Sequence, residues 1–195
     1  MAAITPPDWA SLPMSVTARA VYESSFLPLY RELQKDVNNT PLIVLVWGPG
    51  PSSGDLYLKR LQIRGELRKL GHTALFSEEI DADEPAPYFS SKMREFLQAK
   101  GADFIVVLQA SPGSTAEVHD FAEFVLELGR KMLIFIDESA VHGYSYTGAL
   151  QEMNMLYKNV ETYSYPKDIT DCNLLSAVKN KIKILQWAKF RSRIR

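Results

Sequence analysis

Cysteine is almost absent from this chain, because its 195 residues include only Cys172. A single thiol can form no intrachain disulfide, and it cannot supply the several thiolates of a zinc cluster. The chain also lacks a surplus of charge, since its formal net charge is −1. Such a balance gives no global field that would attract nucleic acid or an anionic membrane. We interpret Cys172 as a buried or partly buried thiol near the start of a helix.

Long apolar runs and targeting signals are missing as well. No stretch reaches the roughly 20 apolar residues that a membrane-spanning helix needs. Residues 1–13 lack the basic region and apolar core of a secretory signal peptide. We therefore expect a cytoplasmic protein. Hydrophobic residues nevertheless make up 46% of the chain, which is enough for a substantial core and too many for a disordered chain.

Five short apolar runs alternate with amphipathic segments. The runs cover residues 41–47, 73–76, 104–108, 132–136 and 160–165. Runs that are apolar on both faces and bounded by turn residues are typical of buried parallel strands. Their alternation with helices predicts a three-layer α/β sandwich of the flavodoxin-like or Rossmann-like kind. For five parallel strands, we expect the order 2-1-3-4-5.

The remaining segments predict helices and connecting loops. Amphipathic spacing predicts helices at residues 15–37, 56–70, 87–100, 147–157 and 171–190, and another that follows Ser114 and ends near Leu128. Pro28 should kink or divide the first of them. We interpret the acidic run 77–84 as a solvated loop. Residues 1–40 are expected to form an N-terminal arm and helix, and residues 41–195 the α/β domain.

The first expected strand leads into a loop that is rich in glycine and hydroxyl groups. Its candidate substrate-binding residues are Gly48, Pro49, Gly50, Ser52, Ser53, Gly54 and Asp55. Such a loop can bring backbone amides close to an anion at a helix N-terminus. It has neither the Gly-Lys-Ser/Thr of a P-loop nor the spacing of a dinucleotide fingerprint. A plain turn with Asp55 as a capping residue explains the same residues equally well.

A turn and a carboxylate follow the third expected strand. The turn supplies the candidate binding residues Ser111, Gly113, Ser114 and Thr115, and Glu117 lies in the first turn of the next helix. If strands one and three are neighbours, both loops flank one crevice at the switch point of the sheet. A carboxylate there can act as the nucleophile of retaining sugar transfer. Alternatively, Ser114 and Glu117 form a capping box that involves no chemistry.

Three other features have both a functional and a structural interpretation. Tyr144, in the loop after the fourth strand, could cover the site or be a half-buried aromatic residue. On a helix, His119 would point away from Glu117. It is either a structural residue or a general acid that protonates the departing base. The acidic run 77–84 does not have the spacing of a calcium loop. We expect no metal, and no FMN or other cofactor.

These motifs resemble the nucleoside 2-deoxyribosyltransferase superfamily, including its nucleotide N-glycoside hydrolase branch. The resemblance spans about residues 42–160 and rests on Trp47-Gly48-Pro49, Arg64–His72, Gly113–Val118 and Phe121-Ala122. It implies that Glu117 attacks the anomeric carbon of a sugar and that the first loop holds sugar or phosphate. It also implies a homo-oligomer, a dimer or larger. Similar small domains resemble effectors of stress or phage-defence systems, which is our hypothesis for the biological role.

The expected function is therefore cleavage of the N-glycosidic bond of a nucleoside, a nucleotide or NAD, by hydrolysis or by transfer. The expected partner is this small-molecule substrate, with no membrane contact and no direct nucleic-acid binding. A non-catalytic nucleotide-binding or signalling module on the same fold is the alternative. It is favoured by Trp47, which stands where the superfamily often has an aromatic hydroxyl, and by the absence of an aspartate from residues 109–112.

Overall fold

The computed structural model describes residues 13–83, 89–109, 124–143, 146–171 and 173–193. The chain divides into two compact units. One unit is Pro41–Lys181, and the other combines Met1–Thr40 with Ile182–Arg195. Among the described residues, no helix has the length and apolar character needed to cross a bilayer.

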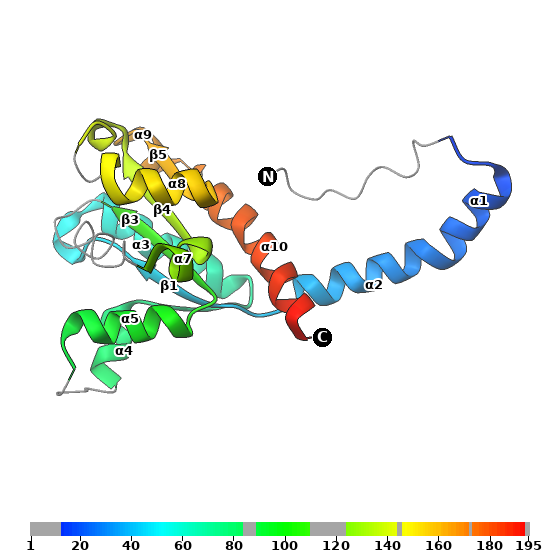
Figure 1. Cartoon of the computed structure of the whole chain (residues 1–195), viewed down its shortest axis with the longest axis horizontal. Helices are drawn as coiled ribbons and strands as arrows, with labels where there is room; N and C mark the ends of the chain where they lie inside the picture. The colour runs from blue at the N-terminus through cyan, green and yellow to red at the C-terminus, as the bar shows by residue number, and fades with distance from the viewer. Residues whose placement is uncertain (1–12, 84–88, 110–123, 144–145, 172, 194–195) are drawn as a thin grey trace. The chain divides into compact units, whose positions relative to one another are not determined.

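The larger unit is built on a parallel sheet of five strands (Figure 1). The strands are β1 (Ile43–Trp47), β2 (Thr73–Leu75), β3 (Phe104–Gln109), β4 (Met132–Asp137) and β5 (Val160–Tyr163). Their order in the sheet is β2-β1-β3-β4-β5, and every neighbouring pair is parallel. The predicted α/β fold, strand number and strand order are therefore confirmed.

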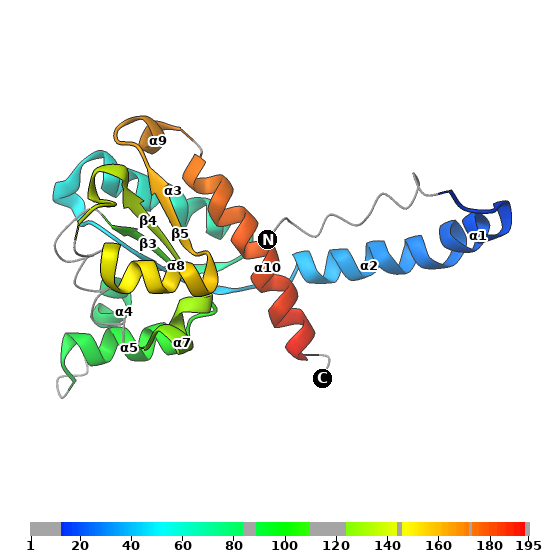
Figure 2. The same cartoon turned by 45° about the horizontal axis from the view of Figure 1, so that its top comes forward.

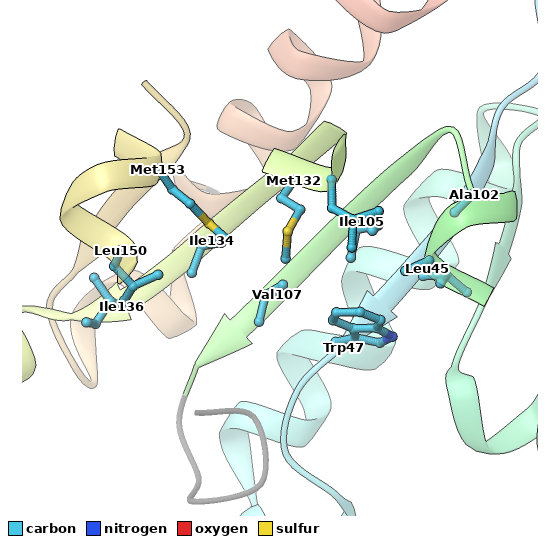
Figure 3. Close-up of a cluster of buried hydrophobic side chains, with 12 residues drawn as sticks. Leu45, Trp47, Ala102, Ile105, Val107, Met132, Ile134, Ile136, Leu150 and Met153 are labelled. Atoms are coloured by element: carbon cyan, nitrogen blue, oxygen red, sulfur yellow. The ribbon is translucent and has the colours of Figure 1, made fainter. Parts of the chain in front are cut away.

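Both faces of the sheet are buried, which explains why the strands have continuous apolar sequences. One face carries Leu45, Trp47, Ile105, Val107, Ile134 and Ile136, and Leu150 and Met153 of the neighbouring helical segment pack against them (Figure 3). The alternate residues of β1, β3 and β4 point to the opposite face and are buried there as well. All six residues of β3, the central strand, are buried.

Helices cover the two faces of this sheet (Figure 2). The helical elements of the larger unit are η3 (Pro51–Ser53), α3 (Asp55–Lys69), α4 (Ser77–Asp83), α5 (Ser91–Gly101), α7 (Val125–Leu128), η5 (Gly129–Lys131), η6 (Glu138–Ala140), η7 (Tyr146–Leu150), α8 (Gln151–Tyr157) and α9 (Lys167–Thr170). Side chains from α4, α5 and α8 pack against the Leu45–Trp47 face. The last helix, α10 (Asn173–Arg193), continues from this unit into the smaller one.

The smaller unit contains the predicted N-terminal helix in three parts. They are α1 (Val16–Val21), the π-helical turn η2 (Tyr22–Phe26) and α2 (Leu27–Asn38). The π-helical turn ends two residues before Pro28, which has no N–H to donate to that turn. The predicted helix is confirmed, and its backbone stays helical through the π-helical turn, so Pro28 does not divide it. At the end of α2, the Gln186 side chain donates to the carbonyl oxygens of Asn38 at 2.8 Å and Thr40 at 3.0 Å.

Two sequence interpretations are wrong. The acidic run 77–84 is not a loop, because residues 77–83 form α4, where Glu79 accepts the Phe76 N–H at 2.9 Å in a capping arrangement. Helix α5 begins at Ser91 rather than at residue 87, because the Ser90 hydroxyl accepts the Met93 N–H and caps the helix there.

Candidate functional site

The candidate loop after β1 lies at the carboxyl edge of the sheet, directly beside the end of β3. Trp47, the last residue of β1, pairs with Val107 near the end of β3. Residues 48–50 leave the strand, η3 follows, and Gly54 is the N-cap of α3. All seven candidate residues of this loop therefore gather at the switch point between β1 and β3. This position is where open α/β sheets bind their ligands.

No side chain caps α3 in this part of the structure. Gly54 occupies the N-cap position with φ 53°, and Asp55 is already the first helical residue. The alternative of a turn capped by Asp55 is therefore not what the loop shows. The first amides of a 15-residue helix and its positive dipole end are left for solvent or an anion.

Gly48 allows β1 to pass unusually close to β3. Its φ of 152° is a conformation that residues with a side chain rarely adopt. A Cβ on Gly48 would lie 3.1 Å from the Leu108 carbonyl oxygen and 3.2 Å from the Leu108 Cβ. The glycine is thus needed both for the turn and for the close approach of the two strand ends.

Gly48→Ala is expected to lower the free energy of unfolding by about 1–3 kcal/mol, because the new methyl group meets backbone at a strained φ. Gly50→Ala is the matched control, since Gly50 has φ −79° and no atom within 4 Å of an added Cβ. Urea unfolding of both variants measures the effect. Equal midpoints for the two variants would contradict the close approach at Gly48.

Arg60 of α3 forms hydrogen bonds with the backbone at the end of β1 and in the loop that follows it. Its Nε and Nη2 donate to the Val46 carbonyl oxygen at 3.0 and 2.9 Å, and its Nη1 donates to the Pro49 carbonyl oxygen at 3.4 Å. The guanidinium also forms a bidentate pair with Glu78 of α4, at 2.8 and 2.9 Å. It stands 3.9 Å from the centre of the Phe76 ring. Arg60 therefore connects the loop, α3 and α4.

A second arginine, Arg64, contacts the same ring one helical turn later. Its guanidinium lies 4.0 Å from the Phe76 ring centre and pairs with Glu79, which also pairs with Arg68. Partial burial raises the pKa of Glu79. The hydrogen bonds from the Phe76 N–H and from Arg64, together with the charges of Arg64 and Arg68, lower this pKa by a larger amount. The net result is a lowered pKa. This cluster was not predicted from the sequence, although the four-residue spacing of the arginines on α3 was a visible signal.

The lowered pKa of Glu79 predicts a loss of stability in acid. Glu79 contributes stability above its ordinary pKa of 4.5, and this contribution is lost as the pH falls through the lower pKa of the folded state. Glu79→Gln should therefore lower stability at neutral pH and flatten its dependence on pH on the acid side. Thermal unfolding between neutral and acidic pH measures both effects. An unchanged pH profile in the variant would contradict the assignment.

Two aromatic residues also form hydrogen bonds at the carboxyl edge of the sheet. The buried Trp47 donates its indole N–H to the Ser77 hydroxyl at 2.6 Å. Tyr163 of β5 donates its hydroxyl to the carbonyl oxygen of Gln109, the last residue of β3, at 3.3 Å. Burial, followed by the charges of Asp137 and Tyr165, raises the pKa of Tyr163 to about 12, so the phenol stays protonated. Tyr163 thus holds the strand end that precedes the predicted turn, a role that was not predicted from the sequence.

The other candidate residues do not fall within the described part of the chain. They are Ser111, Gly113, Ser114, Thr115, Glu117 and Tyr144. The two alternatives for His119 and the interpretation of Cys172 concern residues that also lie outside it. The roles of these residues stay predictions. The structure does show that β1 and β3 are neighbours, and the predicted crevice follows from this arrangement.

A shallow cavity of about 240 Å³ adjoins the start of α3. It is lined by Asp55, Leu58, Lys59, Gln62, Ile169 and Thr170. Lys59 is buried, and its Nζ donates to the Asp171 carbonyl oxygen at 2.7 Å. Within the described ranges, no group of three or more His, Cys, Asp or Glu side chains could hold a metal ion.

Comparison with known proteins adds no family assignment to this geometry. No protein-family model matches the chain, and no curated protein sequence matches it significantly. What is shown is therefore the parallel α/β fold with its five-stranded sheet.

Proposed function

We propose that the protein cleaves the N-glycosidic bond of a nucleoside, a nucleotide or NAD, with Glu117 as the nucleophile. The observation that carries the proposal is the pairing of Trp47 with Val107. Because β1 and β3 are parallel neighbours, the first loop and the segment after Gln109 leave the sheet at the same edge. An anion cradle and a carboxylate at that edge would serve one ligand.

The first loop favours a substrate that carries a 5′-phosphate. The start of α3 has backbone amides that no side chain caps, and Ser52 and Ser53 add hydroxyl donors beside them. Arg60 fixes the loop from below through the Val46 and Pro49 carbonyl oxygens, so the amides are preorganised. This arrangement supports the binding of phosphate by backbone groups rather than by a lysine.

The proposed chemistry follows the retaining route for glycosides. The Glu117 carboxylate attacks the anomeric carbon as the bond to the base breaks, through an oxocarbenium-like transition state. The departing base takes up a proton, and a glycosyl ester remains on Glu117. Water then hydrolyses the ester, or a second base captures the sugar.

Release of free base is the decisive measurement. Purified protein is incubated with ribo- and deoxyribonucleosides, their 5′-monophosphates and NAD, and the products are separated by chromatography. Free base from one of these classes would establish the activity and identify the substrate. Adding a second free base then separates transfer from hydrolysis. No release from any of them by the folded protein would overturn the proposal.

A non-catalytic nucleotide-binding module is the second candidate, because Trp47 is fastened to Ser77 and offers no hydroxyl to orient a glutamate. Calorimetric binding of a nucleotide without any base release would favour this candidate. We also expect a homo-oligomer, which sedimentation of the purified chain would test.

A further inference from the structure

Positive charge is concentrated in the last helix of the chain. Between Asn173 and Arg195 there are seven basic residues and no acidic one. Because the whole chain has a net charge of −1, the preceding 172 residues carry a net charge of −8. The near-neutral balance thus conceals a cationic helix attached to an acidic body.

The exposed side of this helix is both cationic and apolar. In its last turns, Ile184 is 43% exposed and Trp187 is 39% exposed. Arg191 follows Trp187 by four residues, so these three side chains share one face of α10. Lys183, Arg191 and Arg193 are exposed and form no ion pair within the described part of the chain.

The opposite side of the same helical segment is already occupied. Ile182 and Gln186 are buried, and Gln186 caps α2. The exposed face is therefore not needed to hold the smaller unit together. Ile184 and Trp187 thus keep about two-fifths of their surface accessible among cations, and an apolar surface with a polar rim is typical of an interaction site.

We propose that this face of α10, formed by Lys183, Ile184, Trp187 and Arg191, docks on an anionic lipid bilayer. Helices that lie in a membrane interface combine Lys and Arg with Trp and other large apolar residues in this way. Tryptophan is suited to the headgroup region, because its ring is apolar and its N–H is polar. This proposal is independent of the catalytic one, and it departs from our expectation of no membrane contact.

A lipid surface explains the face better than nucleic acid does. Both are polyanions that lysine and arginine recognise, but Ile184 offers nothing to a phosphate backbone or a base. The Trp187 and Phe190 rings lie nearly parallel, 24° apart with their centres at 6.3 Å, so one face of each ring is turned toward the other. Ile184 and Trp187 together fit the boundary between headgroups and acyl chains.

Co-sedimentation with vesicles tests the proposal on the full chain. Vesicles of phosphatidylcholine mixed with phosphatidylserine should bind the protein, and pure phosphatidylcholine should bind it far less. Each cation near an anionic leaflet strengthens binding about fivefold, so Lys183→Glu/Arg191→Glu should weaken it by about a hundredfold or more. Arg130→Glu/Lys167→Glu is the matched control, because it makes the same change of charge at exposed positions outside this face.

Trp187 provides a second measurement. Its fluorescence should shift to shorter wavelength on anionic vesicles, and Trp187→Phe should abolish that shift while it retains most of the binding. Circular dichroism confirms that the variants are folded. Equal loss of binding in the control pair, no binding to anionic vesicles, or binding only to a single-stranded oligonucleotide would each overturn the proposal.

Discussion

Glu117→Gln is expected to lower base release by about a thousandfold or more, because an amide cannot form the glycosyl ester. The protein should remain folded with nearly unchanged stability. The measurement is single-turnover base release from the substrate that the panel identifies, compared with the denaturant midpoint of the same variant.

The substitution separates the catalytic interpretation of Glu117 from the structural one. In a capping box, glutamine serves as well as glutamate at the third helical position, so Glu117→Gln preserves the cap. Glu117→Ala removes both the cap and the nucleophile, and it should lose about 1 kcal/mol of stability in addition to activity. If Glu117→Gln retains turnover, then the nucleophile lies elsewhere. If only Glu117→Ala has an effect, and only on stability, then Glu117 is a cap.

The sheet was predictable because the signal for a buried parallel strand is local. The apolar runs 43–47, 104–108 and 132–136 carry large hydrophobic residues at every position, since helices cover both faces. The strand order then followed from the number of strands and the handedness of the crossovers. The neighbouring positions of β1 and β3, on which the candidate site depends, were therefore accessible from sequence.

The environment of the first loop was not predictable in the same way. Residues 77–83 are too acidic to suggest a packed helix, and they form one because Arg60 and Arg64 neutralise Glu78 and Glu79. The arginine and glutamate of each pair are at least 15 residues apart in the sequence, so no local sequence pattern predicts these ion pairs. For the turn that contains Glu117, the motif itself could be recognised from the sequence, because its residues are consecutive. The groups that surround Glu117 come from distant parts of the chain and could not be predicted.

Arg60→Ala is expected to lower the free energy of unfolding by about 3 kcal/mol. The side chain is 3% exposed, and its removal leaves the buried Val46 carbonyl oxygen without two of its donors. It also releases the Pro49 carbonyl oxygen and one face of Phe76. Urea unfolding measures the loss, and the wild-type chain under the same conditions is the reference.

Two further variants identify which part of the Arg60 interactions matters. Glu78→Ala should cost about 1 kcal/mol or less, because the Glu78 side chain is 56% exposed, so solvent screens the ion pair, and Arg60 keeps its Val46 and Pro49 acceptors. Arg60→Lys keeps the charge but loses the planar fork that reaches Val46, Pro49 and Glu78 together, so most of the loss should persist. If the loop binds phosphate, Arg60→Lys should also raise KM for a 5′-monophosphate more than for the matching nucleoside.

Equal losses of stability in Arg60→Ala and Glu78→Ala would contradict this role of Arg60. They would mean that the ion pair alone stabilises the region, and that the loop does not depend on Arg60.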